Sequence, residues 1–276
     1  MSFGFGFGFT KITAAIRAAS PPAFSPASLF ANNEPGVWLD PSDFSTMFQD
    51  AAGTVPVTAV EQPVGRILDK SGRGFHATQT TATSRPVLRQ DGNGKHYLYF
   101  DGVDDLLVTP TITPGVDKVQ VFAGVRKLSD PAGSAASLCG SVTDPGGGNN
   151  GHFEILTSDL YSKRYFNFIS RGSVLSVAGT TSNSFASPKT LIASGIGDIS
   201  GDKCILRFNG AQAVISTTDQ GTGNYGNYPL YIGRRGGTSL PFNGHLYSLI
   251  VRFGSNLPIN TIEQAEAWIN DKTGAY

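Results

Sequence analysis

Carboxylate side chains are scarce in this sequence, and this limits the acid–base chemistry that it can perform. A retaining glycosidase needs two carboxyl groups about 5 Å apart, a spacing that alternate residues of one strand supply. The chain contains five glutamates, none of them two residues from another acid on a predicted strand: Glu34, Glu61, Glu154, Glu263 and Glu266. We expect Glu154 to lie on a sheet face or toward a partner, and Glu263 and Glu266 to lie on a helix surface. The sequence therefore predicts no catalytic carboxylate pair.

The sequence carries weaker patterns for two other kinds of chemistry, lyase catalysis and calcium binding. His152, Arg164 and Tyr165 could meet on neighbouring strands, as the side chains of a polysaccharide lyase do. The histidines are isolated from one another, and no phosphate loop is present. Oxygen ligands that suit Ca²⁺ come from three aspartates without EF-hand spacing: Asp101, Asp104 and Asp105. We expect no cofactor and no catalytic metal, and calcium beside these aspartates stays open.

Two polar loops are better suited to binding. Residues 221–228 carry two tyrosines among asparagines and glycines, and residues 146–151 are rich in glycine and asparagine. Tyrosine offers a flat ring and a hydroxyl, and asparagine offers adaptable hydrogen bonds, a mixture that suits sugar rings. If the loops lie together, they predict a glycan site formed by Asn149, Asn150, Asn224, Tyr225, Asn227 and Tyr228. The alternative is a solvent-exposed connection with one tyrosine folded inward.

Phenylalanine alternates with glycine at the start of the sequence. In an extended chain Phe3, Phe5, Phe7 and Phe9 all lie on one side, and the other side is bare backbone. Glycine loses much conformational entropy on ordering, so we expect this segment to order only in a groove or at a sheet edge of another subunit. A disordered leader is the alternative.

Residues 10–19 show apolar residues at helical spacing and predict a short amphipathic helix. Pro21, Pro22 and Pro26 then form a stiff spacer. We therefore predict an anchoring arm over residues 1–27 and one β domain over residues 28–276.

Composition excludes several classes of protein. Only 15% of residues are charged and the formal net charge is zero, so no basic stripe suggests a nucleic-acid partner. No apolar run is long enough for a membrane span, and the N-terminus makes a poor signal peptide, so we expect synthesis in a cytoplasm. Cys139 and Cys204 form no CxxC motif, and we expect two buried thiols rather than a disulfide.

Strand patterns dominate the chain after residue 37. They are dense over residues 96–100, 105–109, 118–126, 152–157, 164–170, 173–178, 190–197, 203–208, 211–216, 229–233 and 244–253. Asn209-Gly210 between two strands predicts a tight hairpin, because both residues tolerate positive φ. A helix follows, capped by Asn260 or Thr261, packed through Trp268 and ended by Gly274.

Four segments together resemble the laminin-G-like, concanavalin-A-like jelly rolls. They are Phe100-Asp-Gly-Val-Asp-Asp105, Asn209-Gly210, Tyr231-Ile-Gly233 and Phe242-Asn-Gly-His-Leu-Tyr247. The resemblance covers residues 37–276 and implies an all-β jelly-roll sandwich with a short C-terminal helix, preceded by the extended arm. In that family Asp101 and Gly102 look like turn residues beside a sheet edge. The resemblance implies a surface that binds or adheres more than one that catalyses.

A second resemblance is to structural proteins of phages and prophages. It lies in the leader and in Trp38-Leu-Asp-Pro-Ser-Asp-Phe44, Phe48-Gln-Asp-Ala-Ala-Gly-Thr54, Pro63-Val-Gly65 and Leu68-Asp-Lys-Ser-Gly-Arg-Gly74. It implies a non-enzymatic virion protein made in the bacterial host cytoplasm. We favour a homo-oligomeric tail fibre or adhesin, a trimer by analogy with its class, whose arm binds neighbouring virion proteins and whose sandwich binds host-surface glycan. A head decoration protein and a glycan hydrolase or lyase are the alternatives.

Overall fold

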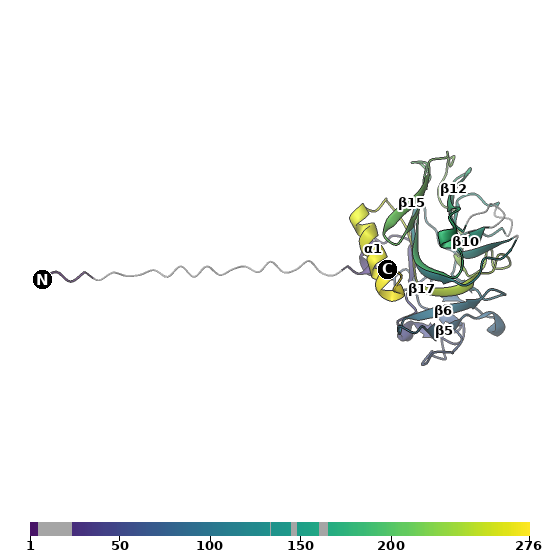
Figure 1. Ribbon diagram of the computed structural model, residues 1–276, viewed down its shortest axis with the longest axis horizontal. Coiled ribbons are helices and arrows are strands. Elements are labelled where there is room, and N and C mark those ends of the chain that lie inside the picture. Colours follow the sequence, from purple (N-terminus) through teal and green to yellow (C-terminus); the bar gives the residue numbers. More distant parts are fainter. Residues whose placement is uncertain (5–23, 133, 145–147, 160–164) are drawn as a thin grey trace.

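The computed structural model describes residues 1–4, 24–132, 134–144, 148–159 and 165–276. Within these residues the chain forms two antiparallel β-sheets packed face to face, with one α-helix near the C-terminus (Figure 1). The structure therefore confirms the predicted all-β sandwich and its C-terminal helix.

Among the described residues, sheet A has eight strands and sheet B has nine. The path of sheet A is β15 (Ala211–Ser216), β14 (Lys203–Phe208), β13 (Lys189–Asp198), β8 (Lys118–Lys127), β17 (Asn243–Phe253), β6 (His96–Asp101) and β5 (Val87–Gln90), and β1 (Gly36–Leu39) also pairs with β17. The order of sheet B is β12 (Leu175–Thr180), β11 (Phe166–Arg171), β10 (His152–Asp159), β9 (Ala135–Gly140), β16 (Tyr231–Ile232), β7 (Leu107–Val108), β4 (Ala77–Thr78), β3 (Arg66–Ile67) and β2 (Met47–Phe48).

The hydrophobic core lies between the two sheets. Val121 on β8 and Leu206 on β14 meet Phe153 and Phe168 from sheet B, and all four side chains are fully buried. Gly195 on β13 lets the sheets approach, because a Cβ atom there would lie 2.2 Å from the Phe168 ring. The sheets therefore pack tightly around Phe168.

The hairpin between β14 and β15 is as predicted. Asn209 and Gly210 both have positive φ, 49° and 82°, which is the conformation that a two-residue type I′ turn requires. Strand β9, by contrast, was not predicted. Its sequence Ala-Ala-Ser-Leu-Cys-Gly lacks β-branched and aromatic residues, and its strand conformation depends on complete burial between β10 and β16.

Helix α1 (Ile259–Thr273) packs on the outer face of sheet A. Trp268 contacts Trp38 edge to face with ring centroids 5.5 Å apart, and Ile262 and Ile269 are buried beneath the helix. Gly274 ends the helix in the left-handed conformation, as predicted. The predicted cap at Asn260 or Thr261 is wrong, because the N-cap is Pro258, which makes no side-chain cap bond.

The 3₁₀ helix η1 (Pro26–Phe30) joins the domain, since Leu29 and Phe30 are buried against the outer face of sheet A. Three further 3₁₀ helices are η2 (Phe44–Thr46), η3 (Ala82–Ser84) and η4 (Asn183–Phe185). Phe3 is 92% exposed, whereas Phe5, Phe7 and Phe9 lie outside the described residues, so the arm stays a prediction. The domain boundary near residue 27 likewise stays a prediction.

Two remaining expectations concern the cysteines and the membrane. Cys139 and Cys204 are both free and fully buried, which confirms the two predicted thiols, and burial raises the pKa of the Cys204 thiol to about 12. None of the helices found in the described residues is long and apolar enough to cross a membrane.

Candidate functional site

Five connections meet at one end of the sandwich and form its loop end, which we define by their described residues: 109–117, 141–144 with 148–151, 172–174, 199–202 and 217–230. Backbone hydrogen bonds join them. The Gly226 amide donates to the Gly151 carbonyl over 2.8 Å, and the Gly151 amide donates to the Gly172 carbonyl over 3.1 Å. The Tyr225 amide donates to the Val116 carbonyl over 2.9 Å. The two loops that the sequence paired as a glycan site are therefore in direct contact.

Tyr225 does not face solvent, and this corrects one predicted ligand residue. Its side chain is 2% exposed and packs between Phe153 and Phe253 in the core. Its hydroxyl lies 2.6 Å from Ser170 Oγ, and burial raises the pKa of this hydroxyl. A ring enclosed on all sides offers no face to a sugar, so Tyr225 anchors the loop from below.

Tyr228 and the asparagines remain at the surface. The Tyr228 hydroxyl donates to the Asn150 carbonyl over 2.9 Å and so connects the two predicted loops. Asn224 and Asn227 are exposed, and Asn224 Nδ2 donates to the Gly115 carbonyl over 3.0 Å. Asn149 instead stabilises its own loop, because its side chain donates to the Ser141 carbonyl. Tyr228, Asn150, Asn224 and Asn227 thus share one surface.

A cavity of about 420 Å³ opens in this surface. It is lined by Asp117, Ile199, Ser200 and residues 221–224, so the tip of the tyrosine loop forms one wall. The backbone of this tip is held by its own hydrogen bonds, since the Gly221 amide donates to Asp219 Oδ1 over 2.6 Å and the Thr222 amide donates to Ser173 Oγ over 3.1 Å. The lining offers mixed donors and acceptors around one small apolar contact, Ile199.

Charged side chains hold the floor of this cavity in place. Lys118 Nζ lies 3.0 Å from Asp117 Oδ1, 3.1 Å from Asp198 Oδ1 and 3.1 Å from Ser200 Oγ. Burial opposes ionisation of Asp117, but the hydrogen bonds from Ser200 and Lys118 outweigh it and lower the pKa of this carboxyl. Asp117 is therefore a carboxylate at neutral pH and can accept hydrogen bonds from hydroxyl groups.

The glutamates that hydrolysis would require are engaged in buried ion pairs. Glu154 is fully buried, accepts from Ser137 Oγ over 2.6 Å and pairs with Arg235, whose Nη2 lies 2.6 Å from Glu154 Oε2. Glu266 is 1% exposed and pairs with Arg207, so the expectation that it lies on the helix surface is wrong. Glu263 is exposed, as predicted.

His152 and Tyr165, which the sequence offered for a lyase, lie apart. His152 lies opposite Arg171 on the neighbouring strand, whereas the Tyr165 amide pairs with the Thr180 carbonyl at the other end of β11. Arg164 lies outside the described residues. His152 is itself 1% exposed, with Nδ1 bonded to the Asn149 carbonyl oxygen, and it holds that loop rather than a substrate.

The three aspartates considered for calcium do lie together, with one ligand atom from each within 4.8 Å of the others. Asp105 is buried and accepts from the Asp101 amide, and Asp104 accepts from Ser84 Oγ. Asp101 and Gly102 form a turn, as expected, since Gly102 has a φ of 80° and Asp101 Oδ1 accepts from the Val103 amide. Calcium binding at this turn, which the sequence left open, stays an open question.

Sequence reasoning missed a second group of aromatic side chains, on the outer face of sheet A. Tyr97 stacks on His245 with centroids 3.8 Å apart, Tyr99 lies 6.1 Å from the same histidine, and the Arg89 guanidinium lies over Tyr99. Burial and the nearby Arg126 lower the pKa of His245 to about 4, so its ring is neutral at pH 7. The alternation Tyr97-Leu-Tyr99 could have indicated this face, because residues two apart share one side of a strand.

Known proteins match this chain in structure but not in sequence. No protein-family model and no curated protein sequence matches it. The structure titled "Cell entry of botulinum neurotoxin type C is dependent upon interaction with two ganglioside molecules" matches with a TM-score of 0.57 and 11% identity, over 89% of this chain and 53% of that chain. The binding domain of botulinum neurotoxin DC, in complex with SialylT, matches with a TM-score of 0.54 and 11% identity, over 86% and 52%.

The receptor-binding domain of botulinum neurotoxin type G has a TM-score of 0.51 and 12% identity, over 74% of this chain and 49% of that chain. This chain therefore spans about half the length of the structures that it matches. These similarities confirm the predicted jelly-roll β-sandwich, the class of protein that the fold defines. At such low identity they establish the fold alone.

Proposed function

We propose that this chain is a non-enzymatic carbohydrate-binding protein whose loop end binds the glycan. The observation that carries the proposal is the cavity between Asp117, Ser200 and residues 221–224, on the same loop as Tyr228, whose hydroxyl bonds to Asn150. Carboxylate, hydroxyl, amide and backbone groups converge there, and they match the alternating donors and acceptors of a sugar ring. The neurotoxin domains with this fold support the proposal, because a ganglioside presents an oligosaccharide.

The ion pairs of the glutamates favour binding over hydrolysis. A general acid must release a proton to the substrate, but Glu154 is held by Arg235 and Ser137 and has no access to solvent. In the described part of the chain, no second carboxylate pairs with Glu154. An adhesin needs only the complementary surface.

We place this activity on a bacteriophage virion, as a tail fibre or adhesin displayed outward. The basis is the resemblance of the segments between Trp38 and Gly74 to phage structural proteins, together with the phenylalanine–glycine arm. In this proposal the arm binds neighbouring virion proteins, the chain is a homo-oligomer and the host cell supplies the glycan. Immunogold labelling of intact particles should place the protein on the tail, and labelling confined to the head would favour the decoration role.

A glycan array probed with the full chain tests the binding proposal. Asn224→Ala and Tyr228→Ala should each lose most of the signal for bacterial surface oligosaccharides, because both side chains lie on the loop-end surface. Asn93→Ala is the matched control, since Asn93 is exposed in the turn between β5 and β6. Equal signals for all three variants, or turnover of the polysaccharide by the purified chain, would contradict the proposal.

A further inference from the structure

Strand β15 is an unprotected edge of sheet A. It pairs with β14 on one side, and in the described part of the chain no strand pairs with its other side. Its sequence Ala-Gln-Ala-Val-Ile-Ser carries no charge and no proline, the residues that usually prevent an edge strand from pairing with another chain. Ile215 is 46% exposed on this strand. The backbone of β15 is therefore available to accept one more strand.

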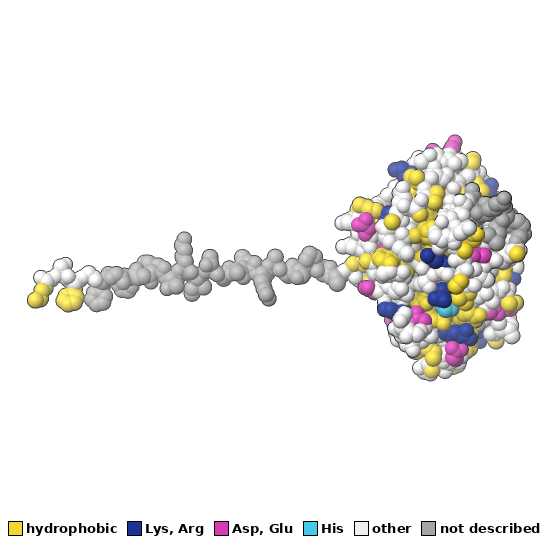
Figure 2. Space-filling model, in the orientation of Figure 1, with side chains coloured by type: hydrophobic (Ala, Val, Ile, Leu, Met, Phe, Trp, Pro, Cys, Tyr) yellow, Lys and Arg dark blue, Asp and Glu magenta, His cyan; other side chains and the backbone are white. Residues whose placement is uncertain are grey.

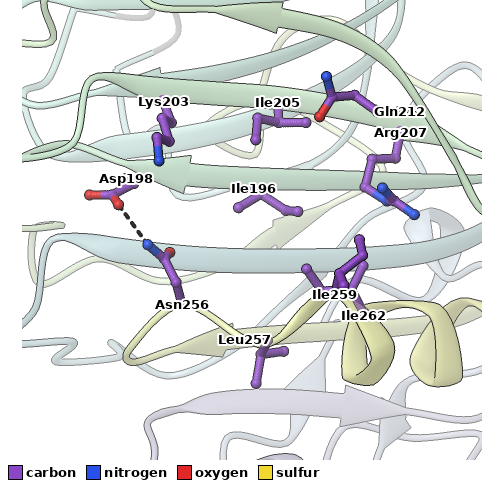
Figure 3. Close-up of a pocket in the computed structure, with 10 residues that line it drawn as sticks. All are labelled: Ile196, Asp198, Lys203, Ile205, Arg207, Gln212, Asn256, Leu257, Ile259 and Ile262. Atoms are coloured by element: carbon purple, nitrogen blue, oxygen red, sulfur yellow. Dashed lines mark hydrogen bonds between the residues drawn. The ribbon is translucent and has the colours of Figure 1, made fainter.

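An apolar row leads across the outer face of sheet A to this edge. Ile196 on β13 pairs with Ile205 on β14, and Ile205 pairs with Ile215 on β15, so the three side chains share one face. A groove of about 210 Å³ covers the Ile196 and Ile205 part of this row, walled by Leu257, Ile259 and Ile262 at the start of α1, and Ile215 lies outside its lining (Figure 3). Ile259 is 56% exposed, so apolar surface remains on the helix side as well.

The two ends of the groove differ in chemistry. At one end Asn256 Nδ2 donates to Asp198 Oδ2 over 2.6 Å, a bond that Figure 3 shows beside Lys203. Near the other end Arg207 forms a bidentate ion pair with Glu266. Its Nε lies 2.8 Å from Glu266 Oε1 and its Nη2 lies 2.9 Å from Glu266 Oε2. An occupant therefore meets an apolar floor between Asp198 and Arg207, which are already paired, with the exposed Lys203 beside Asp198. Such a surface suits uncharged apolar side chains.

Little space separates the inner face of β15 from strand β12 of sheet B. Ser216 Oγ lies 3.0 Å from Ser176 Oγ of β12, so the edge strands of the two sheets are close together there. A strand added to β15 can thus carry bulky side chains on the outer face, beside Ile215, but not toward β12. Its outward side chains must be apolar and its inward positions must be small.

The first residues of the chain have this pattern. In Ser2–Phe9 every second residue is phenylalanine and the residues between them are glycines. We propose that Ser2–Phe9 of a second copy adds to β15 as an edge strand, with its rings on the outer face beside Ile215, where they extend the Ile196–Ile205–Ile215 row by one strand, and with its glycines toward β12. The stiff proline spacer predicted at Pro21 and Pro22 favours delivery to a neighbouring copy. The inference rests on the proposed arm and names its docking surface.

Disulfide trapping in the full chain tests this pairing. Ile215→Cys is combined in turn with Phe3→Cys, Phe5→Cys, Phe7→Cys and, as matched controls, Gly4→Cys and Gly6→Cys. The native thiols of Cys139 and Cys204 are fully buried and do not compete. Under mild oxidation the phenylalanine positions should form cross-linked dimers or larger species several-fold more than the glycine positions, because only they share a face with residue 215. Equal yields at both sets of positions, or disulfides formed within one chain, would overturn the proposal.

A non-covalent measurement supports the trapping experiment. In sedimentation experiments Ile215→Lys should weaken self-association roughly tenfold, because a charge replaces an apolar contact at the added strand. Val103→Lys is the control, since Val103 is 66% exposed in a distant turn. Unchanged association of Ile215→Lys contradicts the docking surface. Glycan-array binding per chain should survive in this variant, so failure of the edge pairing is distinguishable from failure of the carbohydrate proposal.

Discussion

Tyr225 and Tyr228 lie three residues apart in the sequence, but their side chains lie in opposite environments. Tyr225 is buried with its hydroxyl on Ser170, whereas Tyr228 lies at the surface and holds Asn150. Sequence reasoning offered both for a sugar, because a loop has no periodicity from which to read which side chain points inward. An inward ring is nevertheless useful to a binding surface, since it fixes the backbone that carries Asn224.

Tyr225→Phe should separate stability from ligand binding. The variant loses the hydrogen bond to Ser170 within the core, which should lower the free energy of unfolding by about 1 kcal/mol. Because the ring is buried, glycan affinity should stay unchanged. Urea denaturation and glycan titration of the same preparation measure the two effects. A large loss of affinity without a loss of stability would show that the tyrosine hydroxyl reaches the ligand.

Asp105 should make stability depend on pH. Burial raises the pKa of this carboxyl from its usual 3.8 to about 6. Between these values the folded protein binds more protons than the unfolded chain, so this residue makes stability fall as the pH rises from about 4 to about 6. Asp105→Asn keeps an acceptor for the Asp101 amide and removes the charge. At pH 7.5 with a chelator present, the variant should be more stable than the wild type by roughly 1–2 kcal/mol.

The control for this prediction is the same pair of proteins at pH 4, where their free energies of unfolding should converge. If the difference between the variant and the wild type is independent of pH, the carboxyl is not protonated in the folded state at intermediate pH. If calcium restores the stability of the wild type at pH 7.5 but not that of the variant, the three aspartates form the cation site that the sequence left open.

At the scale of elements, local signals predicted the turns and the pattern of burial predicted most strands. Asn209-Gly210 and Gly274 have the backbone conformations that their types favour. Strand β9 and the start of α1 could not be predicted in this way. Ala135–Gly140 is a strand because it is buried between its neighbours, and the helix begins at Ile259 after Pro258 without the expected side-chain cap. The ion pair between Glu266 and Arg207 was missed because it joins residues 59 positions apart.

The packing of helix α1 against sheet A depends on Gly124. A Cβ atom at this position would lie 2.0 Å from Thr273 Oγ1 and 2.9 Å from Ile269 Cγ2, so Gly124→Ala must displace the helix. Overpacking of this kind should lower the free energy of unfolding by about 1–3 kcal/mol. Gly92→Ala is the matched control, since no atom lies within 4 Å of its added Cβ. Thermal unfolding of both variants measures the difference, and equal stabilities would show that the helix does not rest on this contact.

At the scale of the whole molecule, the density of strand patterns and the low charge of the sequence predicted the β-sandwich. They did not predict the loop-end cavity. The cavity takes Asp117, Ser200 and Thr222 from three separate connections, and no spacing in the sequence relates them. Basic and acidic side chains are interspersed on the face of the domain in Figure 2, in keeping with the zero net charge. The surface therefore does not attract one class of charged partner, and recognition depends on the shape and hydrogen bonding of the loop end.

Two surfaces compete for the ligand in this account, the loop-end cavity and the Tyr97–Tyr99–His245 face of sheet A. Calorimetric titration of one array-selected oligosaccharide into the full chain, into Thr222→Ala/Asn224→Ala and into Tyr99→Ala decides between them. The loop-end variant should lose affinity at least about tenfold, equivalent to one or two hydrogen bonds, while Tyr99→Ala binds as the wild type does. Full affinity in the loop-end variant, with loss in Tyr99→Ala, would contradict the assignment of the loop end as the binding surface.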